Sequence, residues 1–448
     1  MKQLAFIVGV ALMTSQSFAA DKPNIVVFLT DDQGWLDTTV NGSKDVRTPH
    51  MQKLADQGLT FTHAFVASPS CAPSRAALLT GLVPPRNGAE ANHSKPRAEI
   101  KKLPAYLQEL GYEVVAFGKV SHYRHTKDYG FDHFAHDTFF DQKCIPAAVD
   151  WLKNRKSRRP LCLFVGTNWP HVPWPEKSDY DAEKAGLPPT FIDTPDTRKT
   201  RANYFQAVTN ADDNLGDVRE AALNALGKET IFIFTSDHGA QWPFGKWNLY
   251  DSGIRVPFVV VWPGVTKAGT KTDAMISWID ILPTLVEMAG GETPNNIDGK
   301  SIVPVIRGQK DTHRDRIFTT HAADGDKNIY PSRSVRTQDF KYILNLHPEF
   351  KYTTHIDIFP VRPGIDYWNS WEAAAKEDAK AAAILKRYHQ RPGEELYDLR
   401  NDPYEQHNLA GDPAHANRLK AMRADLEKWM QEKGDEQKVF GKPKLLKE

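Results

Sequence analysis

Two clusters of polar residues follow short apolar runs and could hold a metal ion. One apolar run leads into Asp31 and Asp32, and a later one leads into Asp237 and His238. Neighbouring carboxylates repel one another unless a cation neutralises them, and their oxygens suit a hard divalent ion. Asp-Gly clusters also make ordinary turns and helix caps, and either cluster alone fits both readings. The two together favour a metal site, because both follow strands of one predicted sheet.

A third segment could supply a nucleophile. Residues 68–75 read Ser-Pro-Ser-Cys-Ala-Pro-Ser-Arg and lead into a helix predicted to end near Gly81. Cys71 at the entrance to a helix, with Arg75 four positions on, lies in electropositive surroundings that favour anions and a reactive thiolate. A buried structural cysteine is the alternative on chemistry alone.

The segment Cys71-Ala72-Pro73-Ser74-Arg75, followed by Ala-Ala-Leu-Leu-Thr-Gly, resembles the signature of the type I sulfatases, a family of the alkaline phosphatase-like superfamily. In that family a maturation enzyme reads Cys-X-Pro-X-Arg and oxidises the cysteine to formylglycine (3-oxoalanine). Further matching segments follow in the family's order: Gly-Lys-Val-Ser-His at 118–122, Asn-Trp-Pro-His at 168–171, Ser-Asp-His-Gly at 236–239, Lys246, and Glu-Leu-Tyr-Asp-Leu-Arg-Asn-Asp-Pro at 395–403. The resemblance covers nearly all of the chain after residue 20 and is closest to the iduronate-2-sulfatase branch.

This resemblance implies a Ca²⁺ site. Its ligands would be Asp31, Asp32, Asp237 and His238, with the formylglycine at Cys71 completing the set. Many members of the family carry Asn where this chain has His238, and an imidazole is a less usual Ca²⁺ ligand than an oxygen. His238 would therefore either ligate the metal or hydrogen-bond to a sulfate oxygen.

The resemblance also implies five catalytic side chains besides Cys71: Arg75, Lys119, His122, His171 and Lys246. A hydroxyl of the hydrated aldehyde would attack sulfur, with Arg75 beside it. Lys119 and Lys246 would hold the sulfate oxygens. His171, with Lys246, would protonate the leaving oxygen, and His122 would take the proton from the second hydroxyl to release sulfate. His125 is the alternative to His122 if the local register differs.

The implied substrate is a sulfated carbohydrate, either a polysaccharide or an oligosaccharide derived from it. Candidate sugar-binding residues are His93 and Arg97, between two catalytic motifs, and Trp174, whose flat ring suits a sugar face, although ordinary packing between loops fits Trp174 equally well. Two other functions stay open. One is a phosphate or phosphonate monoester or diester hydrolase of the same superfamily, and the other is a non-catalytic protein that binds sulfated glycan with Cys71 unconverted.

Composition sets wider limits on the function. The chain has 448 residues, 40% of them hydrophobic and 25% charged, which is typical of a globular protein and excludes disorder or a small disulfide scaffold. Lys and Arg total 57 against 56 Asp and Glu, so no broad basic surface for nucleic acid is expected. With three cysteines, at most one disulfide can form.

The first twenty residues predict a secretory signal peptide: Lys2, an apolar run, and small residues ending at Ala20. The apolar run is shorter than the roughly 20 residues that span a bilayer. We therefore expect an exported protein, periplasmic or secreted, that is not held in a membrane after cleavage. Its oligomeric state cannot be predicted.

The elements that must position these residues predict an α/β fold. Buried β-type runs recur between helical segments at residues 24–29, 113–117, 161–165, 231–234 and 258–261. That alternation indicates an alkaline phosphatase-like sandwich, with a mostly parallel central sheet flanked by helices. Beyond about residue 310 the pattern changes to shorter β-type pieces and charged helices. We expect a catalytic domain over 21–310 and a smaller α+β subdomain with a short antiparallel sheet over 311–448.

Overall fold

An eight-stranded sheet runs through the centre of the molecule. The computed structural model describes residues 22–135, 141–361 and 366–447, so the predicted signal peptide lies outside the described residues. The strand order is β10-β2-β9-β7-β1-β6-β4-β5. The strands are β1 (Ile25–Thr30), β2 (Leu59–Phe61), β4 (Glu113–Gly118), β5 (His133–Ala135), β6 (Leu161–Gly166), β7 (Ile231–Ser236), β9 (Phe258–Val261) and β10 (Thr270–Thr272). Only β9 runs antiparallel to its neighbours among these described strands, which confirms the predicted mostly parallel sheet.

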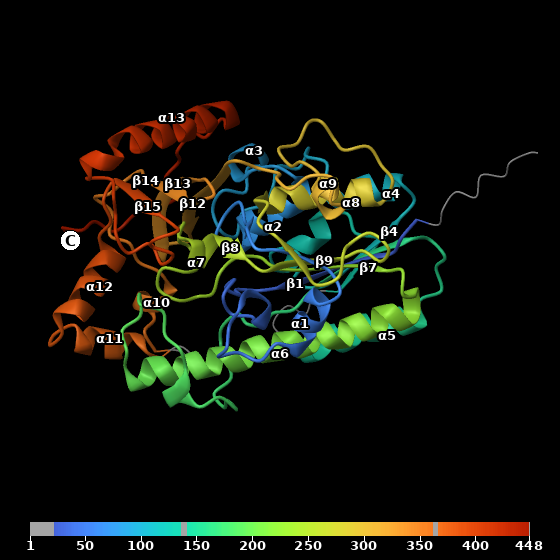
Figure 1. Cartoon of the computed structure of the whole chain (residues 1–448), viewed down its shortest axis with the longest axis horizontal. Coiled ribbons are helices and arrows are strands. Elements are labelled where there is room, and N and C mark those ends of the chain that lie inside the picture. Colours follow the sequence, from blue (N-terminus) through green and yellow to red (C-terminus); the bar gives the residue numbers. More distant parts are fainter. Residues whose placement is uncertain (1–21, 136–140, 362–365, 448) are drawn as a thin grey trace, which may run out of the picture.

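Helices cover both faces of this sheet (Figure 1). One face packs against α1 (Pro49–Ala55), α5 (Asp141–Asn154) and the long α6 (Pro195–Leu226). The other face packs against α2 (Cys71–Thr80), α4 (Leu103–Glu109) and α8 (Ile281–Met288). The strands β1, β6 and β7 are buried along their whole length because both faces are covered, and this explains their continuous apolar sequences.

A second, antiparallel sheet lies beside the first toward the C-terminus. Its strands, in order, are β12 (Ile317–Asp324), β13 (Asn328–Arg336), β14 (Phe340–Asn345) and β15 (Glu394–Asp398). Helix α13 (Ala416–Lys433) packs on it through Leu426 and Trp429. The expected short antiparallel sheet is therefore confirmed, whereas the domain boundary near residue 310 stays a prediction.

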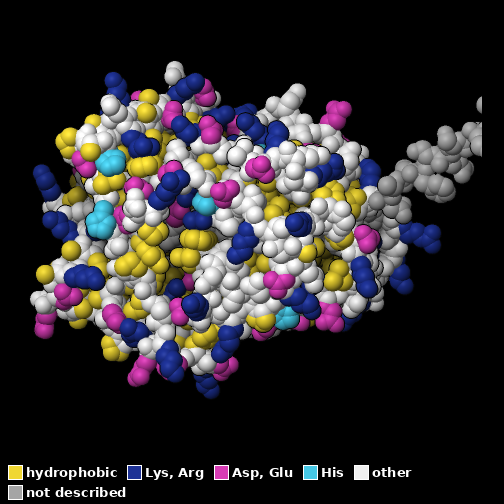
Figure 2. Space-filling model, in the orientation of Figure 1, with side chains coloured by type: hydrophobic (Ala, Val, Ile, Leu, Met, Phe, Trp, Pro, Cys, Tyr) yellow, Lys and Arg dark blue, Asp and Glu magenta, His cyan; other side chains and the backbone are white. Residues whose placement is uncertain are grey.

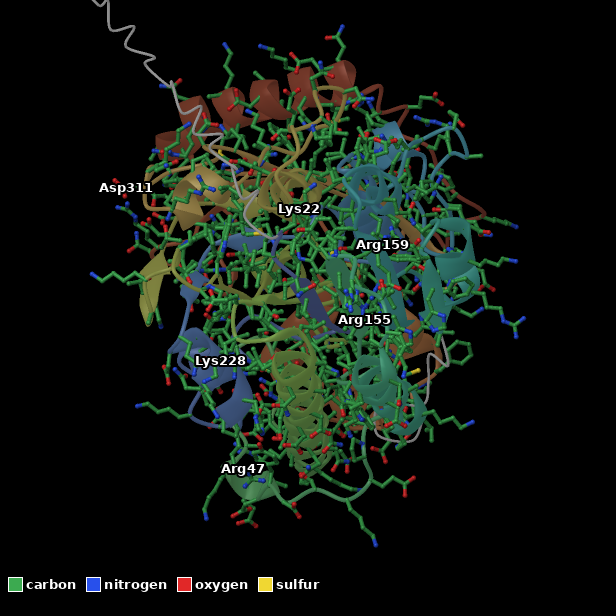
Figure 3. The ribbon with its side chains drawn as sticks, turned by 90° about the vertical axis from the view of Figure 1, so that its right-hand side faces the viewer. Lys22, Arg47, Arg155, Arg159, Lys228 and Asp311 are labelled. Atoms are coloured by element: carbon green, nitrogen blue, oxygen red, sulfur yellow. The ribbon has the colours of Figure 1, made fainter. Side chains whose placement is uncertain are left out.

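The parallel strands point their carboxyl ends toward this second sheet. Figure 3 shows the opposite end of the molecule, where Lys22, Arg159 and Lys228 precede β1, β6 and β7. The polar residues that follow these strands therefore gather on the far side, where open α/β sheets bind their ligands.

The visible surface carries a mixture of charges. In Figure 2 basic and acidic side chains alternate over this face, in keeping with a net charge of +1. Among the helices described, none has the length and apolar character needed to cross a membrane.

Candidate active site

Arg75 and Lys119 neutralise two of the carboxylates predicted to bind metal. Arg75, on α2, donates to Asp31 at 3.1 Å and to Asp237 at 2.9 Å. Lys119 donates to the second oxygen of Asp31, and all four side chains are almost fully buried. Burial alone would raise the pKa of Asp31, but Lys119, His171 and Arg75 outweigh it and hold that pKa well below its ordinary value. Asp31 is therefore ionised.

A glycine at the end of β4 aims Lys119 into this cluster. Gly118 has a φ of +70°, and a Cβ there would lie 2.1 Å from the backbone oxygen of Gly166 on β6. Only glycine accommodates both the close approach and the left-handed turn. The Gly-Lys pair of the sequence motif is thus explained by the backbone.

The third carboxylate, Asp32, faces Lys246 and His171. Lys246 Nζ donates to the two oxygens of Asp32 at 2.9 and 2.8 Å. His171 Nε2 lies 3.9 Å from Asp32 Oδ2, and its Nδ1 lies 2.6 Å from the carbonyl oxygen of Val172. Burial lowers the pKa of His171 to about 4, whereas Asp32 raises that of Lys246 well above its ordinary value despite burial. At neutral pH Lys246 carries the proton and His171 is neutral.

Cys71 begins α2 and lies among these groups. Its Sγ is 3.3 Å from His238 Nε2, 3.5 Å from Lys119 Nζ and 3.8 Å from Asp31 Oδ1. The side chain is 2% exposed and forms no disulfide. Burial raises the pKa of its thiol in spite of the ammonium groups nearby, so the unmodified cysteine is a poor thiolate nucleophile.

Asp32, Asp237, His238 and Cys71 have the spacing of metal ligands, with one atom of each within 4.8 Å of the others. His238 Nδ1 lies 3.0 Å from the carbonyl oxygen of Gly239, and a carbonyl can only accept, so Nδ1 carries the ring proton. Nε2 then presents its lone pair to the cluster, 3.4 Å from Asp32 and 3.5 Å from Asp237. This donor set fits a divalent cation.

The charges of this cluster balance without an ion. Its carboxylates Asp31, Asp32 and Asp237 carry three negative charges, and Arg75, Lys119 and Lys246 carry three positive ones. A divalent cation would leave an excess of about two positive charges in a buried site. Such a site attracts an anionic ester group to Cys71.

Four residues of the cluster and of the cavity beside it have strained backbone. Asp32, His93, Tyr123 and Trp247 have φ between 49° and 67°, in the left-handed region that disfavours residues with a Cβ. Strain of this kind persists only where the surrounding structure imposes it, and it is concentrated at functional sites.

A cavity of about 450 Å³ opens onto Cys71. The predicted residues His93, His122, His171 and Lys246 line it. The structure therefore brings together the metal-binding and catalytic residues that the sequence predicts, although they come from well-separated segments of the chain. His125, the alternative to His122, is half-buried and does not line this cavity.

The part of the chain after residue 310 contributes two residues that sequence reasoning missed. Asp324, at the end of β12, and His355, at the start of α10 (His355–Ile358), line the same cavity. Asp324 precedes Gly325 in a hairpin, which in sequence reads as an ordinary turn. No motif marks either residue, because only the packing of the C-terminal strands and helix α10 against the first sheet brings them here.

Asp324 connects to His122 through His93. His93 Nε2 lies 3.0 Å from Asp324 Oδ1, and His93 Nδ1 lies 2.7 Å from His122 Nε2. Trp247 Nε1 donates to the other oxygen of Asp324 at 2.7 Å. Burial lowers the pKa of His122, so that ring is neutral.

Two predictions of sugar-binding residues find no support in the geometry. Arg97 lies in a separate hollow, paired with Glu99 at 3.4 Å, because the chain turns away after His93. Trp174 is 2% exposed, donates to the carbonyl of Pro170 at 2.6 Å, and packs against other aromatic rings in the core. Neither lines the cavity at Cys71, whereas His93 does.

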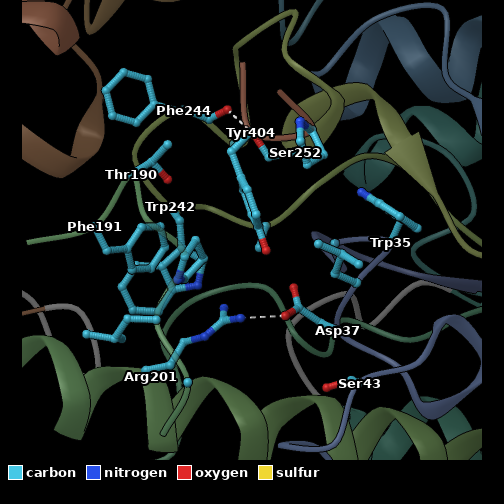
Figure 4. A pocket seen from close by; sticks show the side chains of 18 of the residues that line it. Trp35, Asp37, Ser43, Thr190, Phe191, Arg201, Trp242, Phe244, Ser252 and Tyr404 are labelled. Carbon is cyan, nitrogen blue, oxygen red and sulfur yellow. Dashed lines mark hydrogen bonds and ion pairs between the residues drawn. The ribbon is translucent and has the colours of Figure 1, made fainter. Parts of the chain in front are cut away.

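A second cavity of about 450 Å³ lies elsewhere and is more aromatic (Figure 4). Trp35, Phe191, Trp242 and Tyr404 surround it, and an ion pair between Arg201 and Asp37 crosses its floor at 2.7 Å. None of the predicted site residues lines this second cavity.

Comparison with known proteins identifies the chain. Residues 23–291 match the model of the family described as Sulfatase, which is more than half of the chain. The chain belongs to the sulfatase family. Residues 238–357 of this sulfatase also match the family described as N-sulphoglucosamine sulphohydrolase, C-terminal. The sulfatase is accordingly a sulfuric ester hydrolase, as the sequence predicts.

Two sulfatase relatives match this chain over most of their length. An ulvan-active sulfatase of Formosa agariphila is 33% identical over 441 residues, which covers 95% of this chain and 83% of the relative. The human N-sulphoglucosamine sulphohydrolase is 28% identical over 461 residues, covering 92% of this chain and 90% of the relative.

A solved structure of a 2-O GAG sulfatase has the same fold, with a TM-score of 0.71 at 23% identity, and the match covers 94% of this chain and 95% of that one. The predicted alkaline phosphatase-like fold is thereby confirmed. The predicted likeness to the iduronate-2-sulfatase branch fits this 2-O-sulfatase neighbour.

Proposed function

We propose that this sulfatase is an exported, Ca²⁺-dependent enzyme that hydrolyses sulfate esters of a sulfated carbohydrate through a formylglycine at position 71. The placement of Cys71 carries the proposal. Its Sγ lies within 3.8 Å of His238, Lys119 and Asp31, where the carboxylates, the cations and the open cavity meet. Relatives named for ulvan and for N-sulphoglucosamine support a glycan substrate.

Asp31, Asp32, Asp237 and His238 would hold the calcium ion beside position 71. Bound there, calcium supplies positive charge that polarises a sulfate oxygen, and formylglycine supplies a hydroxyl nucleophile when hydrated. Oxygen atoms dominate this donor set, as Ca²⁺ prefers. The lone pair on Nε2 of His238 faces the same point.

Lys119 and Lys246 would bind the sulfate oxygens, because both carry buried positive charge beside Cys71. Such preorganised charge stabilises the negative charge that develops in the transition state. Arg75 would keep Asp31 and Asp237 in place and add positive charge next to the nucleophile.

Two proton transfers complete the reaction. The leaving oxygen needs a proton, and Lys246 is the protonated neighbour of the neutral His171. Both line the cavity, so His171 can orient the leaving group while the Lys246 ammonium donates the proton to its oxygen. His122, buried and neutral, is suited to accept the proton whose removal releases sulfate.

The test is release of inorganic sulfate by protein co-produced with a formylglycine-generating maturation enzyme. The panel contains sulfated polysaccharides, their oligosaccharides and an aryl sulfate, with Cys71→Ala and chelator controls. Sulfate release that disappears in both controls is expected. Greater release of phosphate or phosphonate from matched esters would favour the alternative hydrolase, and glycan binding with no release from aldehyde-bearing protein would favour a binding protein.

A further inference from the structure

The hydrogen bonds that link Asp324, His93 and His122 in series have a defined donor-to-acceptor direction. Asp324 is 4% exposed and accepts two hydrogen bonds, one on each oxygen, from His93 and from Trp247. The hydrogen bond from His93 and the charges nearby outweigh burial and hold the pKa of Asp324 below its ordinary value. An ionised carboxylate can only accept, so the proton between the two groups resides on His93 Nε2.

That assignment determines the tautomer of the next ring. A neutral imidazole with its proton on Nε2 has a lone pair on Nδ1, and His93 Nδ1 lies 2.7 Å from His122 Nε2. The proton in this second bond therefore belongs to His122 Nε2. His122 is left with its lone pair on Nδ1, a buried atom for which the described residues offer no hydrogen-bond partner.

We propose that His93 and Asp324 are positioning residues that hold His122 as its Nε2–H tautomer, so that Nδ1 is the ring atom that keeps the basic lone pair. The base role of His122 rests on the proposed function, whereas the tautomers follow from the hydrogen bonds and the ionised Asp324. His93 is held for this task in left-handed backbone, at a φ of 66°, although its side chain is half exposed.

The geometry makes a specific prediction for Asp324→Asn. Trp247 Nε1 can only donate, so the new amide must turn its oxygen to Trp247 and its NH₂ group to His93. His93 Nε2 would then become an acceptor, which moves its proton to Nδ1. His122 Nε2 would become an acceptor in turn, and the proton of His122 would move to Nδ1. The single substitution Asp324→Asn, at the far end of this hydrogen-bonded series, should thus reverse the tautomers of both His93 and His122.

The experiment is nitrogen NMR of the full chain labelled only in the histidine rings. Spectra of His93→Asn and His122→Asn assign the two residues, and the tautomer of each ring is read from its two nitrogen shifts. The wild-type protein should show both rings protonated on Nε2, and Asp324→Asn should show both protonated on Nδ1. Asp326→Asn, an exposed neighbour with no contact to His93, is the matched control and should match wild type.

A wild-type His122 protonated on Nδ1 would overturn the proposal without any variant. Unchanged tautomers in a folded Asp324→Asn protein would overturn it too. In the double variant Asp324→Asn with Trp247→Phe, the amide is released from the indole and can accept from His93, so the wild-type tautomers should return at least in part.

Kinetics separate this inference from the proposed function. If His122 is the base, Asp324→Asn lowers kcat on the order of 10²-fold or more while KM changes little, because the basic lone pair is lost. Reversed tautomers with an unchanged kcat would confirm the positioning and refute the base role of His122. A rise in KM at constant kcat, with unchanged tautomers, would instead make His93 and Asp324 substrate ligands.

Discussion

Replacing Arg75 by methionine tests whether the buried cluster is an electrostatic unit built around a cation. The guanidinium is 1% exposed and contacts both Asp31 and Asp237. Methionine keeps most of the volume and removes the charge. Asp31 would retain Lys119, but Asp237 would keep only weak partners, chiefly the backbone N–H of Asp32 at 3.0 Å.

In Arg75→Met the expected loss in the free energy of unfolding is that of one buried, unpaired carboxylate, Asp237, because Asp31 keeps Lys119. Removing one partner of a buried ion pair costs about 3–5 kcal/mol. The variant site carries one more negative charge than wild type, so it should bind Ca²⁺ more tightly. A gain of at least tenfold in affinity would return about 1.4 kcal/mol or more of the loss at saturating Ca²⁺.

Urea unfolding, with and without Ca²⁺, measures both effects. Circular dichroism and tryptophan fluorescence should report coincident transitions, which permits free energies to be compared. Arg336→Met is the matched control, because Arg336 is equally buried and holds Asp251 through two contacts of 3.1 Å outside the cluster. Its loss should be the same at every Ca²⁺ concentration. A loss below about 1 kcal/mol for Arg75→Met, or a loss that Ca²⁺ does not reduce, would refute the reasoning.

Three further outcomes are expected. Chelation of the metal should abolish sulfate release yet lower the melting temperature by only a few degrees, because the cluster is neutral without an ion. Calorimetry measures the melting temperature, and unfolding of the protein on chelation would contradict this expectation. Arg97→Ala should leave kcat/KM on long glycans within about twofold, since Arg97 does not line the cavity, whereas Lys246→Ala should remove activity on every substrate. Burial lowers the pKa of His321 in the folded protein to about 4. As the pH falls, the unfolded chain takes up a proton on this histidine before the folded protein does, so the free energy of unfolding should fall by about 3 kcal/mol between pH 6.5 and pH 4. His321→Gln should remove that part of the pH dependence, and pH-dependent unfolding curves of the two proteins would show whether it does.

The fold was largely accessible from sequence because its strands are buried on both faces. Continuous apolar runs such as 161–165 and 231–234 are readable without tertiary information, and the polar residues after them fall at one edge of the sheet. The motif residues Cys71, Lys119 and Lys246 could therefore be expected to lie together, and in the structure they do.

What sequence could not provide depends on how the second sheet packs. Asp324 lies some 250 positions after Cys71 in a hairpin without a motif, and only the contact between two sheets carries it into the cavity. Arg97 and His93 line different cavities, because neighbours in sequence can face different hollows once the chain turns. Trp174 fills the core, and sequence left both interpretations open because a ring that stacks on sugar and a ring that fills the core look alike in sequence.

The complete burial of α2 has a consequence for the order of events in biosynthesis. Every residue of Cys71–Thr80 is buried, and the cysteine itself is only 2% exposed. A maturation enzyme must bind several residues around Cys71 in an extended, accessible form, and the folded protein does not present them in that form. Under the proposed function, conversion of Cys71 would therefore have to occur while the chain is still unfolded, so a batch that folds unconverted would stay inactive even when the maturation enzyme is added afterwards. Production of active protein would then be decided by the relative rates of oxidation and folding.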